Sequence, residues 1–261
     1  MSTLSQKGFE VLAPEACVRD WVVHARQDAL RAVVDPALSH WHQCQGTWFV
    51  GLEALNNDAV GRVGVSAPLA GVAVDAAHAA LGHWPVLHRA QISVVYPGYP
   101  RPRDGETEAG FRYRLNRDAA HVDGVIGVGQ PKRRYVLEPH AFILGFPLSD
   151  ASADAAPLVV WEGSHHIMRK AFSDAFAGRD PDTLDTVDVT DVYVAARKDA
   201  FEKCARIEVS GPPGSAYLVH RLALHGVAPW GVGATAAPEG RMIAYFRPPM
   251  PGGIARWVLQ D

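Results

Sequence analysis

The sequence predicts a mainly β fold with flanking helices, of the closed or double-sheet antiparallel kind exemplified by the jelly roll. Two observations carry this prediction. The 261 residues include 24 glycines and 19 prolines, about one residue in six, which favours many turns and therefore many short strands. From residue 84 onward, short apolar segments alternate with Gly, Pro and Asp, and one long excursion between residues 163 and 205 has a helical second half.

The first element expected is a helix over residues 14–36, because Pro14 suits a first turn and Pro36 stops the pattern. Its apolar stripe is formed by Trp21, Ala25, Leu30, Val33 and Val34. The Ala/Gly-rich stretch 63–84 is expected to end in a short helix. Strand candidates then follow within residues 85–100, 111–115, 133–148, 156–166, 205–220 and 242–248. In the excursion, a helix is expected to start at Thr190 or Asp191.

Composition excludes several classes of protein. A net charge of −3 provides no global field for nucleic acid or an anionic membrane. Three well-separated cysteines (Cys17, Cys44 and Cys204) indicate a reducing compartment and neither a disulfide framework nor a zinc site. The N-terminus lacks a secretory h-region, and the longest uncharged stretch, residues 222–238, would not span a bilayer. A soluble cytoplasmic protein of one domain, residues 1–261, is therefore expected.

A constellation of metal-ligating residue types stands out among the twelve histidines. In a strand, His121 and Asp123 would point to one face and could reach the same metal, although one such pair is what chance delivers. About a hundred residues later, His220 and His225 follow a strand candidate; they differ by five positions, so in a regular strand they face opposite sides. A His-x-Asp pair with one distant His has the composition of the facial triad that holds Fe(II) and leaves three positions open. Arg241, sixteen positions after His225, offers a guanidinium fork suited to a carboxylate.

These pieces resemble the phytanoyl-CoA dioxygenase family of Fe(II)/2-oxoglutarate oxygenases. The resembling segments, in the family's order, are QISVVYPG at 91–98, HVDG at 121–124, PLVVWEGSHH at 157–166, LHG at 224–226 and RMIAYFRP at 241–248. The resemblance implies a double-stranded β-helix (jelly roll, cupin-like) over residues 84–258, with a helical N-terminal flank over 1–83 and a helical insertion around 167–205.

The resemblance also implies residue roles. His121, Asp123 and His225 would be the iron ligands, and His225 is chosen over His220 because the family's ligand has a similar L-x-H-G setting. Arg241 would bind the C5 carboxylate of 2-oxoglutarate, and Gln91 would lie near this cosubstrate. The spacing from His225 to Arg241 is longer than most relatives use, which leaves Arg247 as a substitute. The carboxylate of Asp123 resembles that of the hydroxylating members, since a chlorinating member has a small residue there.

The expected function is an Fe(II)/2-oxoglutarate-dependent dioxygenase that hydroxylates a small organic substrate and releases succinate and CO2, with dioxygen as second cosubstrate. The alternatives are a non-catalytic jelly-roll binding protein and a zinc-dependent hydrolase. The Arg-rich segment around Arg112, Arg114 and Arg117 suggests an anionic group on the substrate. The insertion is expected to form a lid over the substrate.

The remaining histidines are expected to have ordinary structural roles. His165 and His166 are interpreted as hydrogen-bonding residues that close a strand, and His220 as a buried histidine in the core or behind the ligands. His140 is interpreted either as a pocket residue or as a satisfied core residue. No GxSxG, GxGxxG or P-loop motif is present, so serine-hydrolase, nicotinamide and nucleoside-triphosphate chemistry have no support.

Overall fold

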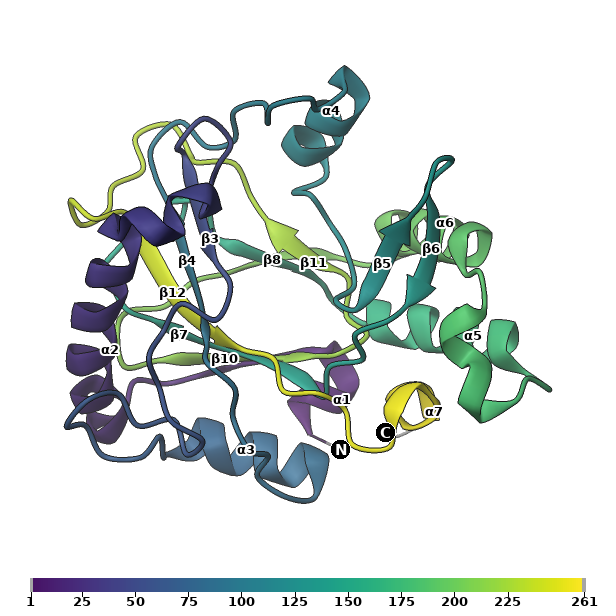
Figure 1. Cartoon of the computed structure of the whole chain (residues 1–261), viewed down its shortest axis with the longest axis horizontal. Coiled ribbons are helices and arrows are strands. Elements are labelled where there is room, and N and C mark those ends of the chain that lie inside the picture. Colours follow the sequence, from purple (N-terminus) through teal and green to yellow (C-terminus); the bar gives the residue numbers. More distant parts are fainter. Residues whose placement is uncertain (1, 260–261) are drawn as a thin grey trace.

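The computed structural model describes residues 2–259 and consists of two facing antiparallel sheets with helices around them (Figure 1). The larger sheet has the strand order β1-β10-β7-β12-β4-β3-β2, and the smaller has the order β11-β8-β9. The strands of the larger sheet are β1 (Phe9–Leu12), β2 (His42–Gln43), β3 (Trp48–Gly51), β4 (Gln91–Val95), β7 (Phe142–Pro147), β10 (Ala216–His220) and β12 (Arg241–Phe246). The strands of the smaller sheet are β8 (Leu158–Trp161), β9 (Arg206–Val209) and β11 (His225–Val227). A separate hairpin pairs β5 (Val125–Val128) with β6 (Arg133–Val136).

The chain passes back and forth between the two sheets. After β4 in the larger sheet, residue His121 bridges to His225 of the smaller sheet, and β7 then returns to the larger one. Next, β8 and β9 lie in the smaller sheet, β10 in the larger, β11 in the smaller and β12 in the larger. This alternation is that of a jelly roll, so the predicted fold class is confirmed.

The strands at the centre of the larger sheet are buried on both faces, which explains their continuous apolar sequences. All six residues of β12 and all six of β7 are buried. Ile243 and Tyr245 of β12 point between the sheets, where they pack with Ile143, Leu158 and Val219. The alternate residues Met242, Ala244 and Phe246 point to the opposite face, where Phe246 packs on Trp21 of the helix over residues 16–34.

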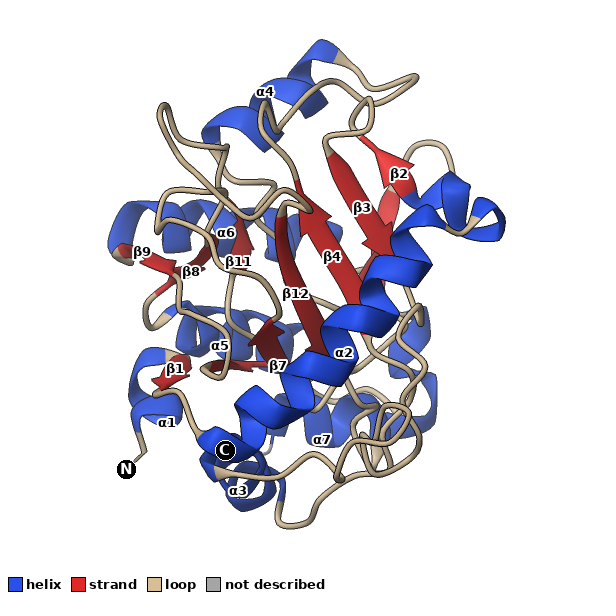
Figure 2. Ribbon diagram, turned by 90° about the vertical axis from the view of Figure 1, so that its left-hand side faces the viewer, coloured by secondary structure: helices blue, strands red, loops and turns tan. Residues whose placement is uncertain are grey.

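The helices are α1 (Thr3–Lys7), α2 (Ala16–Val34), α3 (Val72–Leu81), α4 (Glu108–Asn116), α5 (Ser164–Phe176), α6 (Thr190–Lys203) and α7 (Gly253–Leu259), with two 3₁₀ helices, η1 (Pro36–Trp41) and η2 (Pro181–Thr186). Helices α1, α2 and α3 pack on the larger sheet, whereas α6 packs against α5 and β6. Figure 2 shows α2 running across the face formed by β12, β4 and β3. Trp21 of α2 packs on Phe146 and Phe246, with ring centroids 5.3 and 6.1 Å away.

Several local predictions are confirmed and others are wrong. The helix predicted over 14–36 is α2, but its buried stripe uses Ala29 and Ala32, while Leu30 and Val34 are exposed. The short helix expected in 63–84 is α3, and the helix expected from Thr190 is α6.

The segment 111–115, predicted as a strand, belongs to helix α4. The hydroxyl of Thr107 accepts a hydrogen bond from the Gly110 N–H and caps this helix, which outweighs the alternation of its apolar and basic residues. Likewise the strand expected in 156–166 ends at Trp161, and Ser164, His165 and His166 begin helix α5.

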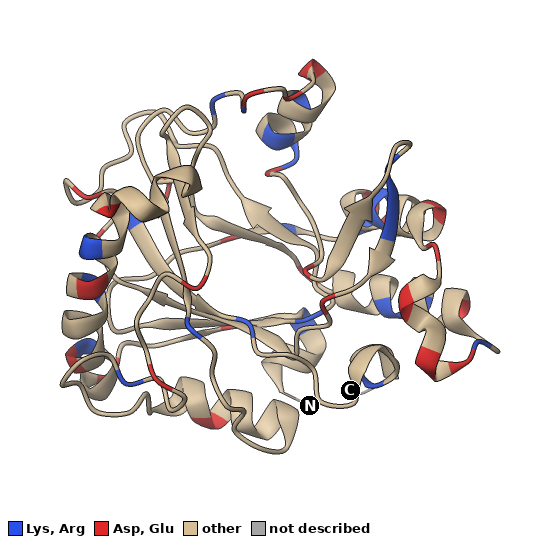
Figure 3. Cartoon of the chain, viewed as in Figure 1, with Lys and Arg blue, Asp and Glu red and all other residues tan. Residues whose placement is uncertain are grey.

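Charged residues gather at the periphery (Figure 3). Lys and Arg are frequent on helix α4 and on strand β6. No helix in the described part of the chain has the length and apolar character needed to cross a membrane.

Candidate metal centre

The three predicted metal ligands come together at one end of the smaller sheet. His225 is the first residue of β11, and His121 and Asp123 lie in residues 118–124, hereafter the ligand segment. Its backbone pairs with β11 at one position: the His121 N–H donates to the His225 carbonyl (2.8 Å) and the His225 N–H to the His121 carbonyl (3.0 Å). The sequence prediction placed His121 and Asp123 in a regular strand, but only His121 is paired and Asp123 lies in a turn.

The distances among the ligand atoms fit a single metal ion. The Oδ1 atom of Asp123 lies 3.2 Å from Nε2 of His121 and 3.8 Å from Nε2 of His225. The three ligand atoms, one from each residue, all lie within 4.8 Å of one another. Among residues 2–259, no other set of three His, Cys, Asp or Glu side chains is grouped in this way. These separations are short enough for one ion to contact all three atoms, so His121, Asp123 and His225 would hold it together.

Backbone carbonyls orient both imidazole rings. Nδ1 of His121 lies 3.0 Å from the carbonyl oxygen of Ala119, and Nδ1 of His225 lies 2.9 Å from that of Ala223. Because a carbonyl oxygen only accepts hydrogen bonds, Nδ1 is the donor of each ring in these two contacts, and each Nε2 atom is directed toward the Asp123 carboxylate. A hydrogen bond from Nδ1 to a second group is the usual way in which proteins orient a histidine that binds a metal through Nε2.

The charge state of the three residues also suits a metal. Burial favours the neutral form of Asp123, but Arg247 and the two histidines outweigh burial and hold the pKa of this carboxyl well below its ordinary value. Burial, followed by the neighbouring His121, lowers the pKa of His225 to about 4. At neutral pH the site therefore offers one carboxylate and a neutral His225.

A pocket of ≈ 180 Å³ opens beside these ligands. Its walls between the sheets are mainly apolar, and they are formed by Trp48, Val50, Leu52, Ile143, Leu158, Val219, Val227 and Tyr245. Gln91 and Ser93 of β4 add polar groups, so the structure brings the predicted residue Gln91 into the same pocket as the three ligands. Arg247, just beyond β12, also lines it and places Nη1 3.4 Å from Oδ2 of Asp123.

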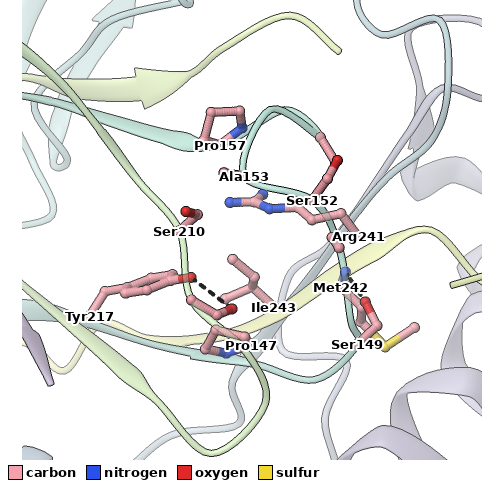
Figure 4. A pocket seen from close by; sticks show the side chains of 13 residues that line it. Pro147, Ser149, Ser152, Ala153, Pro157, Ser210, Tyr217, Arg241, Met242 and Ile243 are labelled. Atoms are coloured by element: carbon pink, nitrogen blue, oxygen red, sulfur yellow. Dashed lines mark hydrogen bonds between the residues drawn. The ribbon is translucent and has the colours of Figure 1, made fainter. Parts of the chain in front are cut away.

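Arg241 occupies a different hollow, deeper between the sheets (Figure 4). It starts β12 on the same face as Tyr245, and it is 6% exposed. The hollow is small, ≈ 20 Å³, and Arg241 shares it with Tyr217, Ile243, Ser152 and Pro157. Neither Nη1 nor Nη2 of Arg241 has a hydrogen-bond partner among the described residues, and the same holds for the hydroxyl of Tyr245. A buried guanidinium without a counter-ion is unfavourable, so this arrangement suits an anion that reaches it from the pocket.

The other histidines lie away from the three ligands. His220 is on the outer face of the larger sheet, where its ring centroid is 4.7 Å from that of His165. Nε2 of His165 lies 3.1 Å from the carbonyl oxygen of Ser5, so this histidine has a hydrogen-bonding role. His140 does not line the pocket of the ligands.

Sequence reasoning missed three residues behind the site. Tyr113 and Tyr193 contact the ligand segment from α4 and α6, and Arg206 pairs with Asp118. Arg247 was weighed only as a substitute for Arg241. Tyr193 and Arg206 lie far from the motifs along the chain, and Tyr113, although close to His121 in sequence, was assigned to a predicted strand, so only the fold reveals the role of these residues.

Comparisons with known proteins concern the fold. No family model matches the chain, and no curated protein matches it. Among solved structures, it is similar to the non-heme alpha ketoglutarate dependent carbocyclase SnoK from nogalamycin biosynthesis (12% identity, 97% of this chain and 86% of SnoK, TM-score 0.50). It is also similar to the epimerase SnoN in complex with Fe3+, alpha ketoglutarate and nogalamycin RO (13% identity, 98% of this chain and 86% of SnoN, TM-score 0.50). At these identities the likeness establishes a shared fold.

Proposed function

We propose that this chain is an Fe(II)/2-oxoglutarate-dependent dioxygenase that hydroxylates a small organic substrate. One observation carries the proposal: two histidine Nε2 atoms and one carboxylate oxygen converge at the mouth of an apolar pocket, with both imidazoles oriented by backbone carbonyls. Two imidazoles and a carboxylate that leave one face open are typical of non-haem Fe(II) oxygenases. The order of the motifs supports the narrower proposal that the chain is a member of the phytanoyl-CoA dioxygenase family.

The protein's contribution is to hold the metal on one side and to shield the other. His121, Asp123 and His225 would bind the iron, and the apolar walls of Ile143, Leu158 and Val219 exclude water from the open face. When bound, iron lets dioxygen oxidise 2-oxoglutarate to succinate and CO2 and places the second oxygen atom on the substrate as a hydroxyl group.

Two arginines supply cationic groups: Arg247 lines the ligand pocket, and Arg241 lies in the separate small hollow. Arg241 would bind the distal carboxylate of 2-oxoglutarate, because its buried terminal nitrogens have no partner among residues 2–259. A carboxylate would approach it past Ile143, Leu158 and Tyr245, which line the ligand pocket, and Gln91 offers a further polar contact. Side-chain rotations at these residues are needed to join the pocket with the small hollow of Arg241.

Arg247 supports the proposal of an anionic substrate. In the described structure its one ion pair is the 3.4 Å contact of Nη1 with Asp123, and the side chain lines the ligand pocket. A carboxylate or phosphate on the substrate would pair with this guanidinium, while the apolar part of the substrate contacts Trp48 and Leu52.

The proposal is tested by adding Fe(II) and 2-oxoglutarate to the protein under anaerobic conditions. We expect a weak visible charge-transfer band and, after dioxygen is admitted, slow succinate release that depends on Fe(II). Substitution His121→Ala should abolish both signals. The matched control is His220→Gln, which changes a buried histidine outside the ligand group and should retain them.

The two alternatives predict different results. A non-catalytic binding protein would show the band but no succinate release with any small carboxylate or phosphate ester tested as substrate. A zinc hydrolase would act with Zn2+ in the absence of 2-oxoglutarate. Absence of the band in folded wild-type protein would refute the oxygenase proposal.

A further inference from the structure

The peptide groups on both sides of His121 are held by tyrosine hydroxyls. The hydroxyl of Tyr113 donates to the Ala120 carbonyl oxygen (2.7 Å), which belongs to the peptide before His121. The hydroxyl of Tyr193 accepts from the Val122 N–H (3.0 Å), which belongs to the peptide after it. Tyr193 is 1% exposed and the ring of Tyr113 is partly buried, so water does not compete freely for these bonds.

These two tyrosines are joined by a third side chain. Nη1 of Arg197 donates to the Tyr113 hydroxyl (2.9 Å). The Arg197 guanidinium also lies over both rings, 5.2 Å from the Tyr113 centroid and 4.8 Å from that of Tyr193. Tyr193 and Arg197 lie one turn apart on helix α6, whereas Tyr113 comes from α4, so Arg197 couples the two helices behind the ligand segment.

The ligand segment has few backbone hydrogen bonds to the strand beside it. It pairs with β11 only at His121 and through the Val227 N–H, which donates to the Asp118 carbonyl (2.9 Å). Asp118 and Ala119 both adopt a left-handed conformation, with φ of 53°, that non-glycine residues rarely adopt. In a regular strand, a neighbouring strand would bond the Ala120 carbonyl and the Val122 N–H; here two tyrosines do so.

We propose that Tyr113 and Tyr193 are positioning residues for the metal ligand His121. Arg197, which contacts both tyrosines, holds their hydroxyls at the positions where they bond the ligand segment. The inference rests on the proposed function in so far as His121 binds a metal. It gives the helical insertion between β8 and β9 a role at the back of the metal centre: α6 fixes the ligand segment instead of covering the substrate.

The test uses the metal-free full-length protein and the variants Tyr113→Phe, Tyr193→Phe and the double variant. Each substitution removes one hydroxyl and keeps the ring that packs beneath Arg197. Tyr99→Phe is the matched control, because Tyr99 is also buried and its hydroxyl has no partner among the described residues. Affinity for Co2+ is measured by calorimetry, the geometry of the site by the visible d–d spectrum of bound Co2+, and the integrity of the fold by the Tm of the apo-protein.

We expect each single variant to bind Co2+ about 10-fold more weakly and to show an altered d–d spectrum, since residues that orient metal ligands typically contribute 10- to 100-fold to affinity. The double variant should lose less than the product of the two single losses, because both hydroxyls act on the position of the same residue, His121. Tyr99→Phe should bind as the wild type does.

Two outcomes would overturn the inference: wild-type affinity and spectrum in both single variants, or an equal loss in Tyr99→Phe. A loss of affinity that follows Tm alone, with an unchanged spectrum at saturating Co2+, also contradicts it, because the hydroxyls would then only stabilise the fold. If the wild-type protein itself binds no Co2+, the proposed function fails, and this result is distinct from all the others.

Discussion

Replacing Gly226 by alanine should move His121 away from His225 without changing any of the three metal ligands. Gly226 follows His225 in β11, and the ligand segment crosses directly over it. A Cβ atom at this position would overlap the carbonyl oxygen of Asp118, and it would lie 3.0 Å from the Asp118 carbonyl carbon and 3.3 Å from Cα of Ala120. All of these are backbone atoms, so no side-chain rotation relieves the clash.

The loss of stability in Gly226→Ala follows from the hydrogen bonds that join the ligand segment to β11. Moving the ligand segment away stretches the two hydrogen bonds between His121 and His225 and the bond from Val227 to Asp118. Each is worth about 1 kcal/mol, and the overpacking itself costs about 1–3 kcal/mol. We therefore expect Gly226→Ala to lower the free energy of unfolding by about 4–6 kcal/mol. For a chain of this length that corresponds to a fall in Tm of roughly 10 °C.

Thermal and urea unfolding of the apo-protein measure this cost, and Co2+ titration of the folded variant measures the separation of the ligands. Affinity should fall more than 10-fold, because His121 moves away from His225. Gly110→Ala on helix α4 is the control: its Cβ would meet only flexible side-chain atoms of Glu106 and Thr107 at 3.3 Å, and alanine should stabilise the helix by about 0.5–1 kcal/mol. Wild-type stability and affinity in Gly226→Ala would refute the close approach of the ligand segment to β11.

Three further predictions concern charged and titratable groups. Arg206→Ala should destabilise the protein by about 1–3 kcal/mol in urea unfolding, because it leaves the buried Asp118 carboxylate without the two hydrogen bonds of 2.7 and 2.9 Å; unchanged stability would contradict this. Arg241→Met should raise the unfolding free energy of the apo-protein by about 1–3 kcal/mol, since it removes a buried unpaired cation, and should weaken 2-oxoglutarate binding measured by calorimetry; a destabilised apo-protein would argue against an unpaired Arg241. Burial lowers the pKa of His165 to about 4, below its value of about 6.5 in the unfolded chain, so the unfolded state takes up a proton first as the pH falls. About 2–3 kcal/mol of stability should be lost between pH 6.5 and pH 4, and His165→Gln should flatten this part of the pH profile of urea unfolding; an unchanged profile in this variant would contradict the low pKa of His165.

Local sequence patterns predicted those elements that are set by residues close together in the chain. Proline at both ends and an apolar stripe identified α2, and runs of apolar residues between Gly and Pro identified β4, β7, β8, β10 and β12. The prediction failed at residues 111–115, where alternating residues suggested a strand. The cap supplied by Thr107 and the packing of Tyr113 against Arg197 favour a helix there, and the second of these depends on a residue more than eighty positions away.

The candidate site divides in the same way. The sequence by itself predicted the ligand set His121, Asp123 and His225: residue chemistry singled out metal-ligating residue types, and the family resemblance selected His225 over His220. Tertiary structure decided the rest: which arginine faces the ligands and which lies in a separate hollow, why Gly226 must lack a side chain, and which tyrosines hold the ligand segment. Each of these depends on distances between chain segments that are far apart in sequence, and such distances arise only when the two sheets and the helices pack together.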